Sequence, residues 1–170
     1  MCEKYGSAGN MIDTVIIGIG SPILSDGAAP LEIVELLRKK NSKGNLKFSS
    51  FPAGGFDLLT ELAEHEKAVI IAAFPDRDEG AAMMTETVVT GGVSGENGAT
   101  ALPGDHGVDL AEVLQLGRTC GYSLPGETII LGIHGAEVHI VSERQSDAVV
   151  ETVKKITQRV EELLDQWDTC

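Results

Sequence analysis

The chain has 170 residues, of which 42% are hydrophobic and only 4% aromatic, and its formal net charge is −13 at pH 7. This length and apolar content are sufficient for one compact domain, so we interpret residues 1–170 as a single domain with a hydrophobic core. Asp and Glu outnumber Lys and Arg by 26 to 13, which argues against a protein that holds a nucleic-acid backbone by its overall field. Nucleic acid is therefore not an expected partner.

The start of the chain and its cysteines show no targeting or metal-binding pattern. Residues 1–10 contain no apolar run, so they do not resemble a signal peptide, and we expect a disordered N-terminal extension there. No stretch approaches the length of a membrane span. Cys2, Cys120 and Cys170 are far apart, which is not typical of a disulfide framework or a zinc knuckle. We expect a cytoplasmic monomer with no membrane partner.

Short apolar runs alternate with segments of helical periodicity along the chain. The expected strands cover residues 14–20, 46–51, 68–74, 84–90, 128–133 and 138–141, with Gly135 separating the last two. The expected helices cover residues 30–40, 56–64 and 146–167, and a further helix starts near Val108 and ends at Gly117 or near Cys120. This alternation predicts an α/β fold, a three-layer α/β/α sandwich around a mostly parallel twisted sheet.

In such sheets, ligands bind at the loops that follow the carboxyl ends of the strands. Here those loops cover residues 18–30, 74–80, 91–106 and 133–137. Residues 91–105 are rich in Gly, Ser and Asn, and a loop of this length is usually functional or mobile. We therefore expect a functional site in these four loops.

The first loop weakly resembles a nucleotide-binding loop. Gly18 and Gly20 would let backbone amides approach a phosphate. A dinucleotide site also needs a third glycine where the helix starts and an acidic residue after the second strand, but Ile23 and Phe51 stand at these positions. Nucleotide binding is therefore only a remote alternative.

Carboxylates and imidazoles gather in the same loops, and together they are able to bind a metal such as zinc or nickel. They are Asp26, Asp76, Asp78, Asp105, His106 and His134. Each also has an ordinary structural explanation: Asp26 as a turn or cap residue, Asp105 as an N-cap, His134 as a packed residue at a strand end. Their joint placement favours Asp26 and His106 as a metal site.

The sequence as a whole resembles the maturation endopeptidases of nickel-iron hydrogenases. These enzymes remove a C-terminal extension from the hydrogenase large subunit after nickel insertion. The similarity runs from Met11 nearly to the end of the chain. The segments that carry it are residues 18–30, 54–59, 106–114, 129–133 and 147–164. The resemblance implies the same α/β/α fold, a nickel-containing large-subunit precursor as partner, and Asp26 and His106 as catalytic and metal-binding residues.

This sequence departs from the family pattern at three positions. Ser21 stands where the family has Asn, and Asp26 remains from a pair of acidic residues. Ala72 replaces the carboxylate that the family carries at the end of the third strand, and Asp76 would need an unusual loop path to reach that place. Because only two protein ligands meet at an open, hydrated cleft, we expect the isolated protein to bind free nickel weakly. The nickel of the reaction is expected to arrive with the substrate protein.

Two functions follow from this pattern. The first is a metal-dependent maturation endopeptidase, and the second is a degenerate factor that binds a hydrogenase precursor without cutting it, which Ala72 motivates. Cys120 and Cys170 lack a setting that would lower a thiol pKa, so a thiol protease is not expected.

Overall fold

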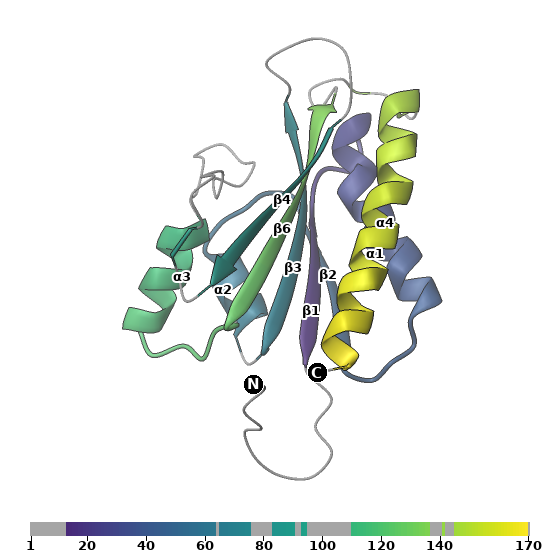
Figure 1. The fold of residues 1–170 in the computed structure, drawn as a ribbon. Helices are drawn as coiled ribbons and strands as arrows, with labels where there is room; N and C mark the ends of the chain where they lie inside the picture. The colour runs from purple at the N-terminus through teal and green to yellow at the C-terminus, as the bar shows by residue number, and fades with distance from the viewer. Residues whose placement is uncertain are drawn as a thin grey trace.

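Figure 1 shows the computed structural model, which describes residues 13–63, 65–75, 83–90, 93–94, 110–136, 141 and 145–169. This part of the chain forms a six-stranded sheet with helices on both faces. The expected extension at residues 1–10, most of the loop at residues 91–105 and the expected strand residues 138–140 lie outside the described residues.

The sheet has a parallel centre and an antiparallel side. Its order is β2-β1-β3-β6-β4-β5, and the first four strands in this order pair in parallel. Their bounds are Leu46–Phe51 for β2, Thr14–Ile19 for β1, Lys67–Pro75 for β3 and Glu127–Ala136 for β6. β4 (Met83–Thr90) pairs antiparallel with β6, and β5 (Val93–Ser94) pairs antiparallel with β4. The predicted α/β fold with a mostly parallel sheet is confirmed.

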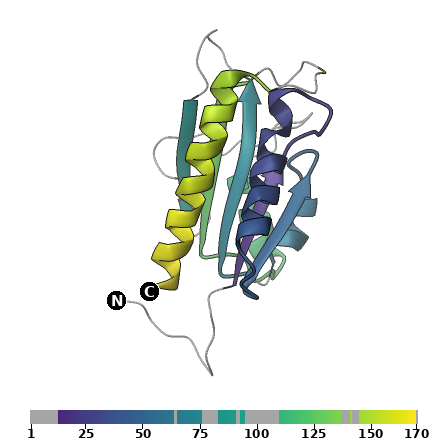
Figure 2. The same cartoon turned by 90° about the vertical axis from the view of Figure 1, so that its right-hand side faces the viewer.

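Two helices cover each face of the sheet. α1 (Ala29–Lys40), preceded by the short 3₁₀ helix η1 (Asp26–Ala28), packs beside α4 (Asp147–Asp168) on one face. α2 (Asp57–Leu62) and α3 (Leu110–Thr119) lie on the other face. Figure 2 shows α1 and α4 side by side in front of the strands.

Side-chain alternation along the strands divides the core into two clusters. On β3, Val69, Ile71 and Ala73 pack with α1 and α4, whereas Ala68, Ile70 and Ala72 pack with α2 and α3. These central residues are at most 5% exposed, because successive side chains of a strand point to opposite faces and both faces are covered. This is why the central strands read as unbroken apolar runs.

Gly135, predicted to separate two strands, lies inside β6, and Gly117, one of the two predicted ends of α3, lies inside that helix. β6 continues through Gly135 to Ala136, because β3 pairs with it up to Pro75, across a register shift after Phe74. α3 continues through Gly117 and ends at Thr119, next to Cys120, which agrees with the second of the two predicted ends. A Cβ at Gly117 would lie 2.6 Å from Leu59 of α2, so this glycine permits close helix packing rather than ending the helix.

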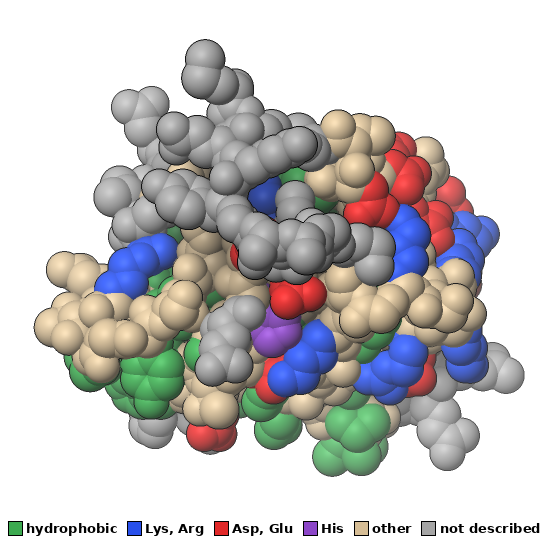
Figure 3. Space-filling model, turned by 90° about the horizontal axis from the view of Figure 1, so that it is seen from below, with side chains coloured by type: hydrophobic (Ala, Val, Ile, Leu, Met, Phe, Trp, Pro, Cys, Tyr) green, Lys and Arg blue, Asp and Glu red, His purple; other side chains and the backbone are tan. Residues whose placement is uncertain are grey.

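Charged side chains of both signs surround the end of the molecule where the parallel strands begin, and some of them form ion pairs. Figure 3 shows this end, with Lys and Arg side chains beside Asp and Glu. Lys43 pairs with Asp168, and Lys67 pairs with Glu127 at 3.1 Å. Trp167 of α4 also donates to Glu127 at 3.1 Å, so these contacts hold the last turn of α4 to β6.

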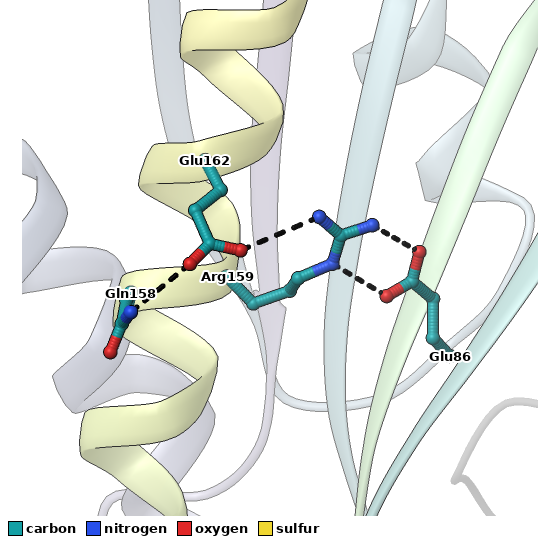
Figure 4. Close-up of polar contacts among 4 residues, drawn as sticks. All are labelled: Glu86, Gln158, Arg159 and Glu162. Atoms are coloured by element: carbon teal, nitrogen blue, oxygen red, sulfur yellow. Dashed lines mark hydrogen bonds and ion pairs between the residues drawn. The ribbon is translucent and has the colours of Figure 1, made fainter.

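A second set of contacts holds the middle of α4 to the antiparallel side of the sheet. Arg159 donates from Nε and Nη2 to the two carboxylate oxygens of Glu86 on β4, each at 2.8 Å (Figure 4). Glu162 lies 3.7 Å from Arg159 and accepts a hydrogen bond from Gln158. The two hydrogen bonds from Arg159 lower the pKa of Glu86 below its usual value, against a smaller opposing effect of burial.

In the part of the chain that the structure describes, no helix has both the length and the apolar character needed to cross a membrane.

Candidate functional site

Asp26 lies at the carboxyl end of the parallel strands, in η1 between β1 and α1, and is fully buried. Its Oδ1 accepts a hydrogen bond from the backbone N–H of Ser146 at 2.8 Å, and its Oδ2 accepts one from the Ser146 hydroxyl at 3.0 Å. Ser146 is the N-cap residue of α4, so the carboxylate also faces the positive end of that helix. The expectation that Asp26 stands in an open, hydrated cleft is therefore wrong, because the start of α4 covers it.

Two further contacts join the same segments. Leu24 forms an isolated antiparallel bridge with Val141, and Gln145 donates to Glu32 of α1 at 2.7 Å. The loop that carries Asp26 is thus joined to the chain entering α4 at two places, and the first turn of α1 is joined to it at a third. This arrangement holds the carboxylate in one orientation.

Close packing within the first loop explains why Gly18 and Gly20 are glycines. A Cβ at Gly20 would lie 2.1 Å from the carbonyl oxygen of Gly27, and one at Gly18 would lie 2.8 Å from that of Pro30. Neither distance leaves room for a side chain, so the loop can fold back on β1 only if both residues are glycine. The glycines are accounted for without a bound phosphate.

Ala72 is fully buried in the cluster that β3 forms with α2 and α3. Its partner on β6 is Gly132, and its partner on β1 is Ile19. Ala72 and Gly132 leave only a methyl group and a hydrogen side by side on neighbouring strands. Ala72 and Asp26 also differ in surroundings, because Asp26 contacts α4, which packs on the opposite face of the sheet.

A polar group on β6 lies two residues beyond Gly132. His134 is partly buried, and its Nε2 lies 2.8 Å from the hydroxyl oxygen of Thr85 on β4. Its ring stacks on Phe74 of β3, with ring centroids 5.0 Å apart and planes 12° apart. The packing of His134 at a strand end agrees with its structural interpretation, whereas its pairing with Thr85 could not be read from the sequence.

Several residues predicted for the site lie outside the described part of the chain: Asp76, Asp78, Asp105 and His106. The structure does not test whether His106 and Asp26 share a metal, and that pairing stays a prediction. Among the described residues, no group of three or more His, Cys, Asp or Glu side chains is placed to hold a metal ion. Of the residues predicted for the site, the structure describes Asp26 and His134.

Sequence reasoning missed Ser146 and Thr85. In the sequence, Ser146 is an ordinary helix-start residue that lies 120 positions from Asp26. Thr85 is an ordinary strand residue that lies 49 positions from His134. Only Ser146 carried a signal, because Ser followed by Asp at the start of an amphipathic run is typical of a helix N-terminus. That signal locates the helix but does not name its partner.

The fold defined by this sheet order and these helix positions is that of the hydrogenase maturation endopeptidases. The structure matches the hydrogenase maturating endopeptidase HybD from Escherichia coli with a TM-score of 0.70 and 19% identity, covering 91% of this chain and 93% of that one. It also matches the [NiFe] hydrogenase maturation protease HybD from Thermococcus kodakarensis, with a TM-score of 0.62 and 20% identity, over 90% and 99% of the two chains.

A third match is the hydrogenase 2 maturation peptidase from a Thaumarchaeota archaeon, with a TM-score of 0.62 and 16% identity, covering 89% of this chain and 97% of that one. No protein-family model matches the sequence, and no curated protein matches it. At these identities the likeness establishes the fold alone. The predicted resemblance is confirmed at that level.

Proposed function

We propose that this protein is a hydrogenase maturation endopeptidase, which removes the C-terminal extension of a nickel-containing large-subunit precursor. The observation that carries the proposal is the match to maturation endopeptidases over about nine tenths of both chains, with no large part of either left over. Fold likeness by itself does not determine function, so the proposal also depends on the residues at the carboxyl end of the sheet.

In this proposal the nickel ion belongs to the substrate, and Asp26 and His106 contact it when the precursor docks. Both carboxylate oxygens of Asp26 accept hydrogen bonds from Ser146. Hydrogen bonds of this kind orient a carboxylate ligand for its metal. Ser146 is then the residue that aims Asp26, and docking must uncover the carboxylate.

The chemistry is hydrolysis of one peptide bond. Water adds to the carbonyl carbon of the scissile bond, and its proton passes to the departing amine. Contact with the metal aligns and polarises the peptide for this attack, which ties cleavage to the presence of nickel in the precursor.

A second function is supported by two specific observations. Asp26 is fully buried, and Ala72 offers no carboxylate in the buried cluster that contains it. A protein with these features is suited to bind the precursor and protect it without cutting it. This binding factor has the same partner as the endopeptidase, the hydrogenase precursor, but leaves the precursor uncut.

The two functions are separated by one experiment. The full-length protein is incubated with a large-subunit precursor, prepared with and without nickel, and the mass of the precursor is followed by intact-protein mass spectrometry. Loss of a C-terminal peptide from the nickel-loaded form alone supports the endopeptidase, with His106→Ala expected to abolish it. A stable complex of unchanged mass supports the binding factor, and the absence of both cleavage and complex would contradict the proposed function.

A further inference from the structure

We propose that the open edge of β2 binds an extended, acidic segment of the hydrogenase precursor, which pairs with β2 as a further strand. This inference rests on the proposed function and adds to it a docking surface outside the loops that carry the predicted site. Three observations support it: the backbone groups that β2 leaves unpaired, the charge around this strand, and the position of its carboxyl end.

β2 is the last strand on its side of the sheet, and in the part of the chain that the structure describes it pairs with β1 alone. Figure 2 shows this strand, in blue, at the side of the sheet next to α1. The carbonyl oxygens of Asn45 and Phe51 accept hydrogen bonds from the N–H groups of Thr14 and Gly20. The backbone groups of successive residues in a strand point to alternate sides, so every second residue from 45 to 51 faces β1.

The residues between them, Leu46, Phe48 and Ser50, present their backbone groups at the open edge. Two of these groups have partners: the Leu46 N–H donates to the Lys43 carbonyl at 3.3 Å, and Arg38 donates to the Phe48 carbonyl at 3.0 Å. Among the described residues, the N–H groups of Phe48 and Ser50 have no hydrogen-bond acceptor. Donors spaced two residues apart along an edge are the groups to which an extended peptide binds when it adds a strand to a sheet.

The chain around β2 is a basic part of an acidic molecule. Residues 36–56 contain five Lys and Arg and no Asp or Glu, whereas the whole chain has a net charge of −13. The Arg38 guanidinium lies 6.0 Å from the ring centroid of Phe48 on the α1 side of the strand. Lys47 lies on the α2 side, where it pairs with Glu61 at 3.1 Å. Cations therefore flank the edge on both faces, and they favour a partner segment that carries Asp or Glu.

The ion pairs of these cations leave their charge available to a partner. Arg38, Lys40, Lys43 and Lys47 each pair with a carboxylate, and each of these four side chains is about half exposed. Ion pairs between exposed side chains contribute little to stability, so a carboxylate of a docking segment can replace them at small cost. The same cations oppose pairing of β2 with the β2 of a second copy, because two basic segments would then lie side by side.

The carboxyl end of β2 lies next to the loop that carries Asp26. Phe51, the last residue of β2, accepts a hydrogen bond at 2.9 Å from the N–H of Gly20, where this loop begins. A segment paired along β2 therefore has one end beside the loop. A strand bound there holds the precursor at the end of the sheet where the proposed site lies, without filling that site.

Amide hydrogen exchange tests the pairing directly. The full-length protein is studied alone and in the presence of the nickel-loaded precursor, and exchange at single residues is read by fragmentation mass spectrometry. We expect the N–H groups of Phe48 and Ser50 to exchange at least about tenfold more slowly in the complex. The N–H groups of Lys47 and Ser49 are the internal control, because they face β1 and should change by less than about twofold.

A proline at the edge removes one donor. The N–H of Ser50 makes no bond to β1, and proline is tolerated at such a position of an edge strand, so Ser50→Pro should fold. We expect it to weaken binding of the precursor at least about tenfold by biolayer interferometry, whereas Ser50→Ala keeps the N–H and should stay within about twofold of the parent protein. Thermal unfolding shows whether each variant is folded, and if Ser50→Pro is not, the exchange measurement on the parent protein decides.

A second pair of variants tests the charge of the occupant. Lys47→Gln removes one cation beside the edge and should weaken binding several-fold at low ionic strength, with a smaller effect in about 0.5 M NaCl. Lys154→Gln is the control, because Lys154 on α4 is also exposed and also forms one ion pair, with Glu151. Equal effects of the two variants would show that the occupant is not acidic and would overturn the inference.

Unchanged exchange at Phe48 and Ser50 in the complex would overturn the inference, as would a Ser50→Pro protein that binds the precursor as tightly as Ser50→Ala. Protection that grows with protein concentration in the absence of precursor would assign the edge to a second copy and also overturn it. If the parent protein binds or cuts the precursor while exchange at β2 is unchanged, the inference fails and the proposed function stands. If the parent protein neither binds nor cuts the precursor, the proposed function fails and the inference fails with it.

Discussion

Both carboxylate oxygens of Asp26 accept hydrogen bonds from Ser146, which lies 120 positions later in the chain. The contact joins the loop after β1 to the N-cap residue of α4, and it is buried at the Asp26 end. The backbone N–H and the hydroxyl of Ser146 replace water at this buried carboxyl group, which would otherwise lose its hydrogen bonds on burial. The same two groups fix its orientation, so the contact matters for stability and for the proposed chemistry.

The Ser146 hydroxyl is expected to stabilise the fold through Asp26. Ser146→Ala leaves one buried carboxylate oxygen without its hydroxyl donor and should lower the free energy of unfolding by about 1–3 kcal/mol. Urea denaturation measures this change. Glu32→Gln is the matched control, because the exposed contact between Glu32 and Gln145 joins the same segments and should contribute less than about 1 kcal/mol. Equal effects of the two variants would contradict a special role for the buried contact.

Restoring a carboxylate at Ala72 should raise nickel affinity and lower stability. Ala72→Asp adds an anionic oxygen ligand, which favours a divalent cation, in a fully buried position where a charge is poorly solvated. We expect tighter nickel binding by calorimetry and a loss of about 3 kcal/mol in the metal-free protein. Ala73→Asp is the control, since Ala73 lies on the opposite face of β3 and should be destabilised without binding nickel more tightly. A similar gain in affinity for both variants would show that position 72 has no particular relation to the metal.

Gly132 is expected to be intolerant of a side chain. Gly132→Ala places a methyl group against Thr85 and His134, so we expect a loss of about 1–3 kcal/mol and a changed His134 ring signal in NMR spectra. A Cβ at Gly126, just before β6, would have no neighbouring atom within 4 Å, so Gly126→Ala should leave both properties nearly unchanged. A Gly132→Ala protein of full stability with an unchanged His134 signal would contradict the close packing over this glycine.

The contact between Glu86 and Arg159 should make stability depend on acid pH. The hydrogen bonds from Arg159 lower the pKa of Glu86 below its ordinary value of 4.5 in the folded protein. A lowered folded-state pKa contributes stability that is present above the unfolded pKa and is lost as the pH falls through the folded pKa. Glu86→Gln should therefore cost about 1 kcal/mol near neutral pH, and the difference from the parent protein should shrink at pH values below 4.5.

Chemical denaturation at several pH values checks this prediction. Glu162→Gln is the control, because Glu162 lies 3.7 Å from Arg159 and its side chain is half exposed. Its removal should change stability by less than about 0.5 kcal/mol at any pH. A difference between Glu86→Gln and the parent protein that stays constant through the acid range would contradict the assigned pKa direction.

The sequence by itself determined the layers of this fold. Unbroken apolar runs at residues 14–20 and 68–74 marked strands covered on both faces, and the stripe of apolar residues along residues 146–167 marked α4. These signals are local, because burial on two faces or on one stripe imposes a fixed period on consecutive residues. The parallel pairing of the central strands was therefore predictable from the alternation of strands and helices along the chain.

Only the tertiary structure decided which polar groups meet. Gly135 read as a strand boundary and Gly117 as one of two possible helix ends. Pairing with β3 carries β6 past Gly135, and close packing against α2 lets α3 continue past Gly117. Asp26 was readable as a site residue, but its partner Ser146 was not, and neither was the contact between His134 and Thr85. Such pairs join segments far apart in the chain, and their side chains come within hydrogen-bonding distance only after the sheet order and the helix positions are set.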